Sequence, residues 1–207
     1  MKDGFIKAAA ASPELRVADV KFNTEESIKC IKEAAENGAK LIVLPELGLT
    51  SYTCGDLFLQ ASLIRLAEQE LLRLADATKN LDILSVAGLP VSDNGKLYNC
   101  AAFVKDGEIL GLVPKSNIPN YSEFYEARHF NTIEGNTEVM FGGRLIPMGT
   151  KLIFTAENMS GFSVAAEICE DLWTAAPPSC EHTKNGAVKF RAEKERQCVI
   201  AIRVADN

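Results

Sequence analysis

A short apolar run at residues 41–44 (LIVL), closed by Pro45, places the firmest limit on how this chain can fold. A run of this length with proline at its end predicts a buried strand. A similar run occupies residues 6–11, and residues 23–37 between the two carry apolar side chains at helical spacing. The order strand, helix, strand predicts an α/β fold in which helices cover a sheet.

The limits of the predicted helices come from their flanking residues. The first helix is expected to start at residues 23–26 (NTEE), which offer capping side chains and acidic first-turn residues, and to stop at Gly38. A second helix is predicted over residues 57–78, where leucine and alanine side chains form one stripe. Each helix therefore has an apolar face to bury against the sheet.

Further strands are expected around a predicted hairpin. The pair Asp106-Gly107 separates two strand-like runs and is typical of a two-residue β-hairpin, so the sheet is predicted to be mixed. Residues 116–130 are polar and aromatic and predict a loop with a short helix. The predicted strands cover residues 83–89, 96–105, 108–113, 151–155, 162–168 and 198–204.

Composition limits the class of function. A chain of 207 residues fits one domain, and 47% hydrophobic with 24% charged residues is ordinary for a folded protein. A net charge of −6 and an isoelectric point near 5.1 argue against broad electrostatic binding of nucleic acid or of an anionic membrane. These values favour chemistry on a small molecule.

The sequence carries no recognisable targeting or metal-binding signal. Residues 1–5 are not a charged leader before an apolar segment, and no run approaches the roughly 18 apolar residues that span a bilayer, so a cytoplasmic protein is expected. The six cysteines form no CxxC pair and His182 stands alone, so no metal site is predicted. In a reducing compartment these cysteines are expected to be free thiols.

Three polar residues come directly after strand-like apolar runs: Glu46, Lys115 and Cys169. Ligand sites in α/β proteins collect at the carboxyl ends of strands, because the sheet positions the side chains and the following loops leave room for substrate. We therefore expect these three side chains to converge in one site.

The three residue types together suffice for acyl transfer. A thiol with a pKa near ~8.5 is mostly protonated at neutral pH, so a nucleophilic Cys169 needs a base, and Glu46 can take its proton. Lys115 supplies a positive charge where an oxyanion develops, a contribution of about 3 kcal/mol per donor. Histidine is not needed for this chemistry.

Three segments resemble the nitrilase superfamily: residues 44–47 (LPEL), 114–121 (PKSNIPNY) and 167–173 (EICEDLW). Their order in the chain also matches that superfamily. The resemblance implies a Glu46, Lys115 and Cys169 triad on an α-β-β-α sandwich. Each short segment alone is a weak signal, but three in order at strand ends make a strong one.

Within that superfamily the chain is most similar to the glutaminase domains of glutamine-dependent NAD synthetases, on residues 46–58, 119–126 and 169–173. The resemblance implies that glutamine is cut to glutamate and ammonia through a γ-glutamyl thioester on Cys169. The ammonia would pass to a separate ATP-dependent domain that amidates deamido-NAD. By the same match the residues expected around the substrate are Tyr52, Tyr121, Glu126 and Trp173.

The resemblance stops near Val188. We expect a partial glutamine amidohydrolase domain over residues 1–188, a divergent tail over residues 189–207, and a sandwich that is incomplete at the C-terminus. No SGGxDS-like loop occurs in the sequence, so ATP and magnesium would belong to a synthetase domain that is absent here, and no cofactor is expected in this domain. The resemblance also implies a homo-oligomer.

The proposed site residues also have structural interpretations. Cys169 could be a buried structural thiol, Glu46 a carboxylate that stabilises a helix N-terminus, and Lys115 a solvated loop lysine. Tyr52 and Tyr121 could be core aromatics whose hydroxyls are hydrogen-bonded.

Two other functions also stay open. One is a stand-alone carbon–nitrogen hydrolase that acts on another small amide. The other is a non-catalytic fragment that folds with a partner and only retains the site residues. Glu126 could form no more than a surface ion pair with Arg128, and His129 is expected to be a packing residue.

Overall fold

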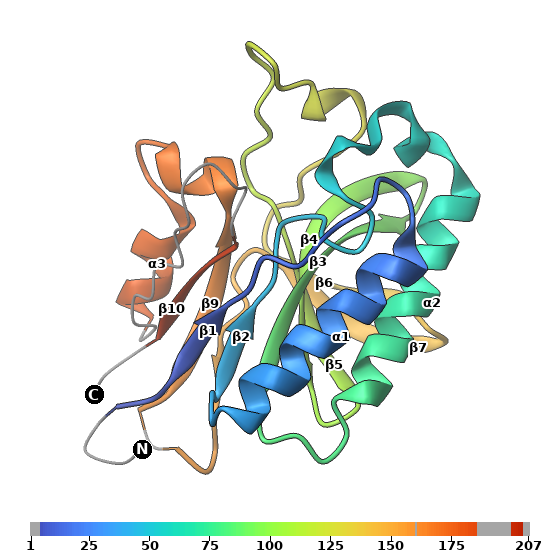
Figure 1. The fold of residues 1–207 in the computed structure, drawn as a ribbon. Coiled ribbons are helices and arrows are strands. Elements are labelled where there is room, and N and C mark those ends of the chain that lie inside the picture. The colour runs from blue at the N-terminus through green and yellow to red at the C-terminus, as the bar shows by residue number, and fades with distance from the viewer. Residues whose placement is uncertain (1–4, 160, 186–199, 205–207) are drawn as a thin grey trace.

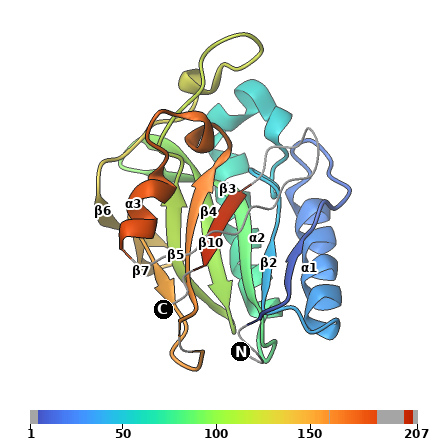
Figure 2. The ribbon, with the colours of Figure 1, turned by 90° about the vertical axis from the view of Figure 1, so that its left-hand side faces the viewer.

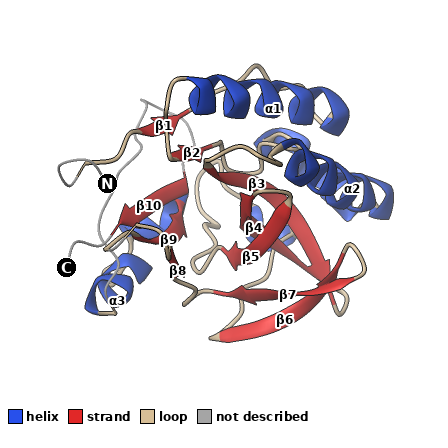
Figure 3. Ribbon diagram, turned by 90° about the horizontal axis from the view of Figure 1, so that it is seen from below, coloured by secondary structure: helices blue, strands red, loops and turns tan. Residues whose placement is uncertain are grey.

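Two stacked sheets lie between layers of helices in the computed structural model, which describes residues 5–159, 161–185 and 200–204 (Figures 1 and 3). Helices α1 (Val20–Glu36) and α2 (Ala61–Ala77) cover the outer face of a seven-stranded sheet. A three-stranded sheet packs on its other face, and α3 (Pro178–Lys184) covers the outer side of this small sheet (Figure 2). The layers are therefore α, β, β and α.

The strand order is β1-β2-β3-β4-β5-β7-β6 in the large sheet and β10-β9-β8 in the small one. The first three strands of the large sheet are parallel, and β3, β4 and β5 follow one another antiparallel, so the predicted mixed sheet is confirmed. The strands are β1 Ala8–Ala10, β2 Leu41–Val43, β3 Leu84–Asp93, β4 Lys96–Lys105, β5 Glu108–Pro114, β6 Asn136–Phe141, β7 Arg144–Gly149, β8 Phe154–Thr155, β9 Ser163–Ile168 and β10 Ile200–Val204.

The apolar runs of the sequence are continuous because the large sheet is buried on both faces. Ile42 of β2 joins the cluster beneath the helices, whereas its neighbours Leu41 and Val43 join the cluster between the two sheets. The small sheet contributes Val164, Ala166 and other β9 residues to the same inter-sheet cluster. The core thus holds β9, and the residue that follows it, against the large sheet.

The predicted hairpin is confirmed, and so is the loop that follows it. Strands β4 and β5 pair up to Lys105 and Glu108, and Asp106 and Gly107 both have positive φ, as a type I′ turn requires. Residues 116–130 form a loop that contains the short helix η2 (Glu126–Arg128). This loop rises above the same end of the large sheet as the 3₁₀ segment η1 (Tyr52–Leu59) (Figure 1).

The predicted start of the first helix is wrong. Helix α1 begins at Val20, because Asp19 accepts a hydrogen bond from the backbone N–H of Phe22 and caps the helix. Asn23 lies inside the helix and bonds instead to the backbone of Arg16 and Leu49.

The second helix starts later than predicted. Helix α2 begins at Ala61, since Gly55 has a φ of 53° inside η1 and Gln60 is extended, so the periodic residues 57–59 belong to a separate 3₁₀ segment. The residues that carry the apolar stripe of α2, including Leu63 and Leu71, are buried as the pattern predicts.

The β6 and β7 hairpin is absent from the sequence-based prediction. Its strands pair from Phe141 and Arg144 outward, around Gly142 and Gly143, which both have positive φ. A glycine pair between two short alternating runs is a hairpin signal that the prediction overlooked. The predicted strand over residues 151–155 is also shorter in the structure, where it covers only Phe154–Thr155.

Strand β10 lies inside the predicted divergent tail. It pairs antiparallel with β9, from Ile200 opposite Ile168 to Val204 opposite Val164. The remaining tail residues lie outside the described part of the chain. No helix among the described residues is long and apolar enough to cross a membrane.

Candidate active site

Glu46 occupies the turn that follows β2. The strand continues to Leu44, whose N–H donates to the carbonyl of Val86 at 2.9 Å, and the chain then turns as Gly48 donates to Pro45 at 3.0 Å. A Cβ at Gly88 would lie 2.4 Å from the nitrogen of Leu47, so only glycine lets this turn pack so closely on β3. The Glu46 carboxylate is consequently buried, at 2% exposure.

Lys115 follows β5 and is fully buried. Its backbone N–H donates to the carbonyl of Asn99 on β4 at 2.8 Å, which extends the strand pairing by one residue. Its ammonium Nζ donates to Oε1 of Glu46 at 2.8 Å and to Oε1 and Oε2 of Glu126 at 2.8 and 2.9 Å. The sequence predicts Glu46, Lys115 and Glu126 as site residues, and the structure brings these three together.

Burial and the neighbouring charges shift the pKa values of Glu46 and Lys115. Burial raises the pKa of Glu46, and repulsion by Glu126 adds to this effect, while attraction to Lys115 opposes it. Burial alone would lower the pKa of Lys115, but attraction to both carboxylates outweighs burial and holds that pKa above its usual range. Lys115 therefore stays cationic, and Glu46 is poised to accept a proton.

Asn99 is a second partner of Glu46. Its Nδ2 donates to Oε1 of Glu46 at 2.6 Å, and its side chain is buried at 1% exposure. Oε1 of Glu46 thus accepts from both Asn99 and Lys115. Oε2 of Glu46 is buried and has no hydrogen-bond partner among the described residues.

Cys169 lies at the end of β9, where the chain turns into the 3₁₀ helix η3 (Cys169–Trp173). Its φ is 46°, a left-handed conformation that costs energy for a residue with a side chain. Its side chain is half-buried and free of any disulfide. A nucleophile on a sharp, strained turn after a strand is presented away from the sheet.

Asp171 connects the Cys169 turn to the segment that follows Lys115. Its carboxylate, at 1% exposure, accepts hydrogen bonds from the backbone of Ser116 at 3.0 Å, Asn117 at 2.7 Å and Ile168 at 2.9 Å. The side-chain amide of Asn117 adds another at 2.9 Å. Burial raises the pKa of Asp171, and these donors oppose that rise. One carboxylate thus joins the strand ends of the two sheets.

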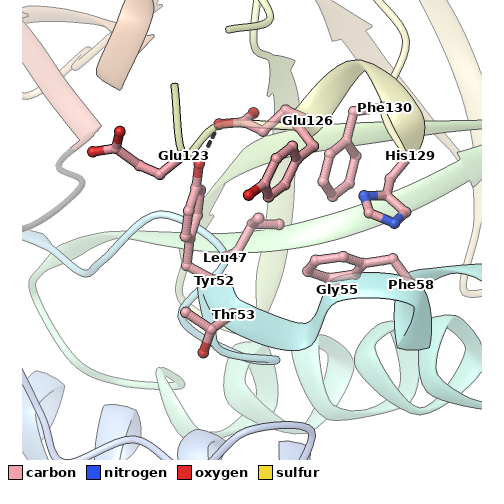
Figure 4. Close-up of a pocket in the computed structure, with 10 residues that line it drawn as sticks. Leu47, Tyr52, Thr53, Gly55, Phe58, Glu123, Glu126, His129 and Phe130 are labelled. Carbon is pink, nitrogen blue, oxygen red and sulfur yellow. Dashed lines mark hydrogen bonds between the residues drawn. The ribbon is translucent and has the colours of Figure 1, made fainter. Parts of the chain in front are cut away.

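Tyr52 and Glu126 border a cavity of about 260 Å³. The Tyr52 hydroxyl donates to Oε1 of Glu126 at 2.6 Å, and this bond forms one side of the cavity in Figure 4. Aromatic rings from η1 and from the loop around η2 form the opposite side. The lining residues are Leu47, Tyr52, Thr53, Gly55, Phe58, Glu123, Tyr125, Glu126, His129 and Phe130.

The other two predicted substrate residues do not line this cavity. Tyr121 is 55% exposed, and its hydroxyl donates to Oε2 of Glu170 at 2.8 Å. Trp173 is 69% exposed at the end of η3. Both lie on the Cys169 side of the site, because Glu170 and Trp173 belong to the turn that Cys169 begins.

Arg128 does not pair with Glu126, so the alternative of a surface ion pair between them is wrong. Arg128 donates to both carboxylate oxygens of Asp56, at 2.7 and 2.8 Å, and Nε2 of His129 lies 3.0 Å from the same carboxylate. This exposed cluster ties η1 to η2. Glu126 turns the other way, into the buried contact with Lys115.

Three residues of this site escaped the sequence-based prediction: Gly88, Asn99 and Asp171. Asn99 offered a signal, since it is an amide within an apolar strand and a buried amide needs hydrogen-bond partners. Asp171 is two residues after the predicted nucleophile, and Gly88 interrupts a strand that is otherwise rich in large apolar residues.

The other described cysteines differ from Cys169 in their surroundings. Burial raises the pKa of Cys54 and Cys100, and Cys54 donates to the carbonyl of Thr50 at 3.0 Å. Cys30 is half-buried and Cys180 is exposed on α3. Cys198 lies outside the described residues. Within the described ranges, no group of three or more His, Cys, Asp or Glu side chains is placed to hold a metal ion.

A family profile described as "Carbon-nitrogen hydrolase" matches residues 7–178. The chain belongs to the carbon-nitrogen hydrolase family. The matched segment runs from the residue before β1 to the first residue of α3 and contains Glu46, Lys115 and Cys169.

Curated relatives of this family member are glutamine-dependent NAD(+) synthetases. The protein of Mycobacterium tuberculosis (strain ATCC 25618 / H37Rv) is 36% identical over 185 residues, which is 89% of this chain and 27% of that protein. The protein of Thermotoga maritima is 34% identical over 179 residues, which is 86% of this chain and 27% of that protein. The chain therefore spans just over a quarter of the length of these relatives.

Solved structures confirm the predicted nitrilase-type α-β-β-α sandwich. A glutamine-dependent NAD+ synthetase from Acinetobacter baumannii, in complex with ADP, has a TM-score of 0.69 and 26% identity, over 92% of this chain and 34% of that one. An amidase from Nesterenkonia sp. has a TM-score of 0.52 and 22% identity, over 70% of this chain and 57% of that one. The second likeness concerns the fold alone.

Proposed function

We propose that this carbon-nitrogen hydrolase cuts the side-chain amide of glutamine through a thioester on Cys169. The observation that carries the proposal is the fully buried ammonium of Lys115, held 2.8 Å from carboxylate oxygens of both Glu46 and Glu126. A fixed cation beside a base at the strand ends suits a reaction in which an oxyanion forms. The names of the curated relatives support glutamine as the substrate.

Each proton in this reaction has a place to go. The S–H bond of Cys169 breaks, its proton moves to Glu46, and the thiolate attacks the amide carbon. Lys115 stabilises the resulting oxyanion by its charge. As the C–N bond breaks, Glu46 returns the proton to the leaving nitrogen and ammonia departs. Glu46 then takes a proton from water, whose oxygen attacks the thioester carbon. The C–S bond breaks, glutamate is released, and Glu46 returns the proton to the thiolate sulfur.

The substrate-binding roles of the remaining predicted residues belong to the same proposal. Glu126 accepts hydrogen bonds from Lys115 and from the Tyr52 hydroxyl, so that Tyr52 and Glu126 together hold Lys115 in place. Tyr121 borders the substrate from the loop that follows Lys115, and Trp173 forms the wall beyond the nucleophile. Tyr121 reaches the turn of Cys169 through its hydrogen bond to Glu170.

The fate of the ammonia is a further part of the proposal. It passes to an ATP-dependent synthetase domain that amidates deamido-NAD, and ATP and magnesium bind to that domain. The support is that relatives named as NAD(+) synthetases are much longer than the segment they share with this chain. We also propose a cytoplasmic location and assembly as a homo-oligomer.

The decisive experiment is mass spectrometry of the 207-residue chain after exposure to a glutamine-mimicking electrophile. We expect one adduct on Cys169 that excess glutamine prevents, together with release of glutamate and ammonia from glutamine. Cys180→Ala is the matched control, since Cys180 is an exposed free cysteine on α3. Faster turnover of a simple aliphatic amide than of glutamine would contradict the substrate. Absence of both adduct and turnover from the folded chain would favour a non-catalytic fragment.

A further inference from the structure

Asn99 contacts two of the proposed catalytic residues at once. Its backbone carbonyl accepts the N–H of Lys115 at 2.8 Å, and its side-chain Nδ2 donates to Oε1 of Glu46 at 2.6 Å. The residue lies on β4, which pairs with both β3 and β5, so its backbone is fixed from two sides. Asn99 therefore fixes the positions of the proposed base and cation relative to each other.

The Asn99 side chain is poorly explained as a packing residue. It is 1% exposed among apolar strand residues, and its Oδ1 has no hydrogen-bond partner among the described residues. Leaving a buried amide oxygen unpaired costs stability, on the order of 1–3 kcal/mol. Leucine has a similarly branched side chain and would not carry that cost. A functional role for the amide explains why it is there.

The two oxygens of Glu46 are treated differently by this arrangement. Oε1 accepts from Asn99 and from Lys115, so its lone pairs are engaged. Oε2 is buried and has no partner among the described residues. A proton that reaches this carboxylate therefore binds most readily at Oε2.

We propose that Asn99 is a positioning residue for amide hydrolysis, which holds Oε1 of Glu46 beside Lys115 and leaves Oε2 to take the thiol proton of Cys169. This inference rests on the proposed function. In the proton step the S–H bond breaks, the electron pair stays on sulfur, and an O–H bond forms at Oε2.

The proposal also defines how Asn99 affects the base. A hydrogen bond to a carboxylate favours its charged form, and the bond from Asn99 is one of the interactions that lower the pKa of Glu46 against the effect of burial. Loss of this donor should raise that pKa. Because activity needs the charged form of Glu46, the acid limb of the kcat/KM profile should then move to higher pH.

The test compares Asn99→Leu and Asn99→Asp with Cys100→Ala in the full chain. Asn99→Leu removes the donor, and we expect the acid limb to move up by about one pH unit. Asn99→Asp keeps the shape and adds a third carboxyl group beside Glu46 and Glu126, so a larger upward movement is expected. Cys100→Ala alters the next residue of β4, which faces the helix side, and should leave the limb unmoved. Asn99→Asp also serves if Asn99→Leu fails to fold.

A direct titration separates this inference from the proposed function. The Glu46 carboxyl is followed by ¹³C NMR of glutamate-labelled chain, with Glu46→Gln to assign its signal. An upward movement in the Asn99 variants supports the inference even if the chain turns over no glutamine. The inference is overturned if the acid limb and the Glu46 carboxyl titration both stay at their wild-type positions in folded Asn99 variants. This holds whatever the activity of the wild type.

Discussion

The two sheets contribute unequal parts to the site. The large sheet carries Glu46 and Lys115, which are 2% and 0% exposed. Lys115 donates to the carboxylates of both Glu46 and Glu126. The small sheet carries Cys169, which is half-buried on a turn with positive φ. The proposed base and cation are thus part of a core that is covered on both faces, whereas the position of the proposed nucleophile depends on how the small sheet packs.

Because of this difference, two groups of contacts around the site should have different effects. Contacts within the large sheet set the charge and the titration of Glu46. The inter-sheet cluster and the hydrogen bonds of Asp171 set where Cys169 lies relative to it. A change within the large sheet should therefore leave the position of Cys169 unchanged, and a change between the sheets should leave the titration of Glu46 unchanged. The predictions that follow use this separation.

The largest effect is expected from replacing the proposed nucleophile. Cys169→Ala should reduce glutamine hydrolysis at least ~10³-fold, because no thioester can form, while the fold and the Glu46 titration stay unchanged. Steady-state turnover and circular dichroism measure the two properties. Alanine variants of Cys30, Cys54, Cys100, Cys180 and Cys198 should keep activity wherever they fold. A comparable loss in one of these would move the nucleophile elsewhere.

A change in the large-sheet part should reduce both activity and stability. Lys115→Met leaves two buried carboxylates facing each other, so we expect a loss of at least ~100-fold in kcat and about 3–5 kcal/mol in the free energy of unfolding. The double variant Lys115→Met with Glu46→Gln removes one of those charges. It should regain stability in urea unfolding but not activity. Equal stability of the single variant and the wild type would show that Lys115 is not structurally required.

Much of the fold could be predicted from the sequence, because strands and hairpin turns depend on residues that are close together in the chain. The runs that became β2, β3 and β9 predicted the buried strands, and Asp106-Gly107 predicted the hairpin. The start of α1 was wrong because Asn23 and Asp19 are both good capping residues. The contacts of Asn23 with the backbone of Arg16 and Leu49 decide between them.

The sequence predicted Glu46, Lys115 and Cys169 as site residues, but not Asn99 and Asp171, which contact them or the segments next to them. Glu46, Lys115 and Glu126 meet in the structure because they follow strands or belong to a loop at one edge. The role of Asn99 depends on which side chain lies beside its amide, and the role of Asp171 on which backbone N–H groups lie beside its carboxylate. A single sequence carries no information of that kind until strand register is known.

A smaller effect is expected from the connection between the sheets. Asp171→Asn places an amide against backbone N–H groups that need acceptors, so the Cys169 turn should shift and kcat/KM should fall about 10-fold. Alkylation of Cys169 should slow as well, whereas the Glu46 titration should stay in place. Glu170→Gln is the neighbouring control, since Glu170 bonds only to Tyr121 among the contacts described. A shift in the pKa of Glu46 in Asp171→Asn would contradict the idea that contacts between the sheets do not affect the titration of Glu46.

The smallest effect is expected at the edge of the large-sheet part, where Tyr52 donates to Glu126 at 2.6 Å. Tyr52→Phe removes one hydrogen bond to a carboxylate that keeps both of its contacts with Lys115. We expect a loss of about 1.5–3 kcal/mol in unfolding free energy and a few-fold drop in kcat, measured by urea unfolding and steady-state turnover. Tyr125→Phe is the matched control, because Tyr125 lines the same cavity but is 66% exposed. Equal losses in the two variants would mean that the cavity wall, and not the bond to Glu126, matters. A loss in Tyr52→Phe alone, with Cys169 alkylated at the wild-type rate, would show that η1 acts together with the large sheet in holding Glu126 and Lys115.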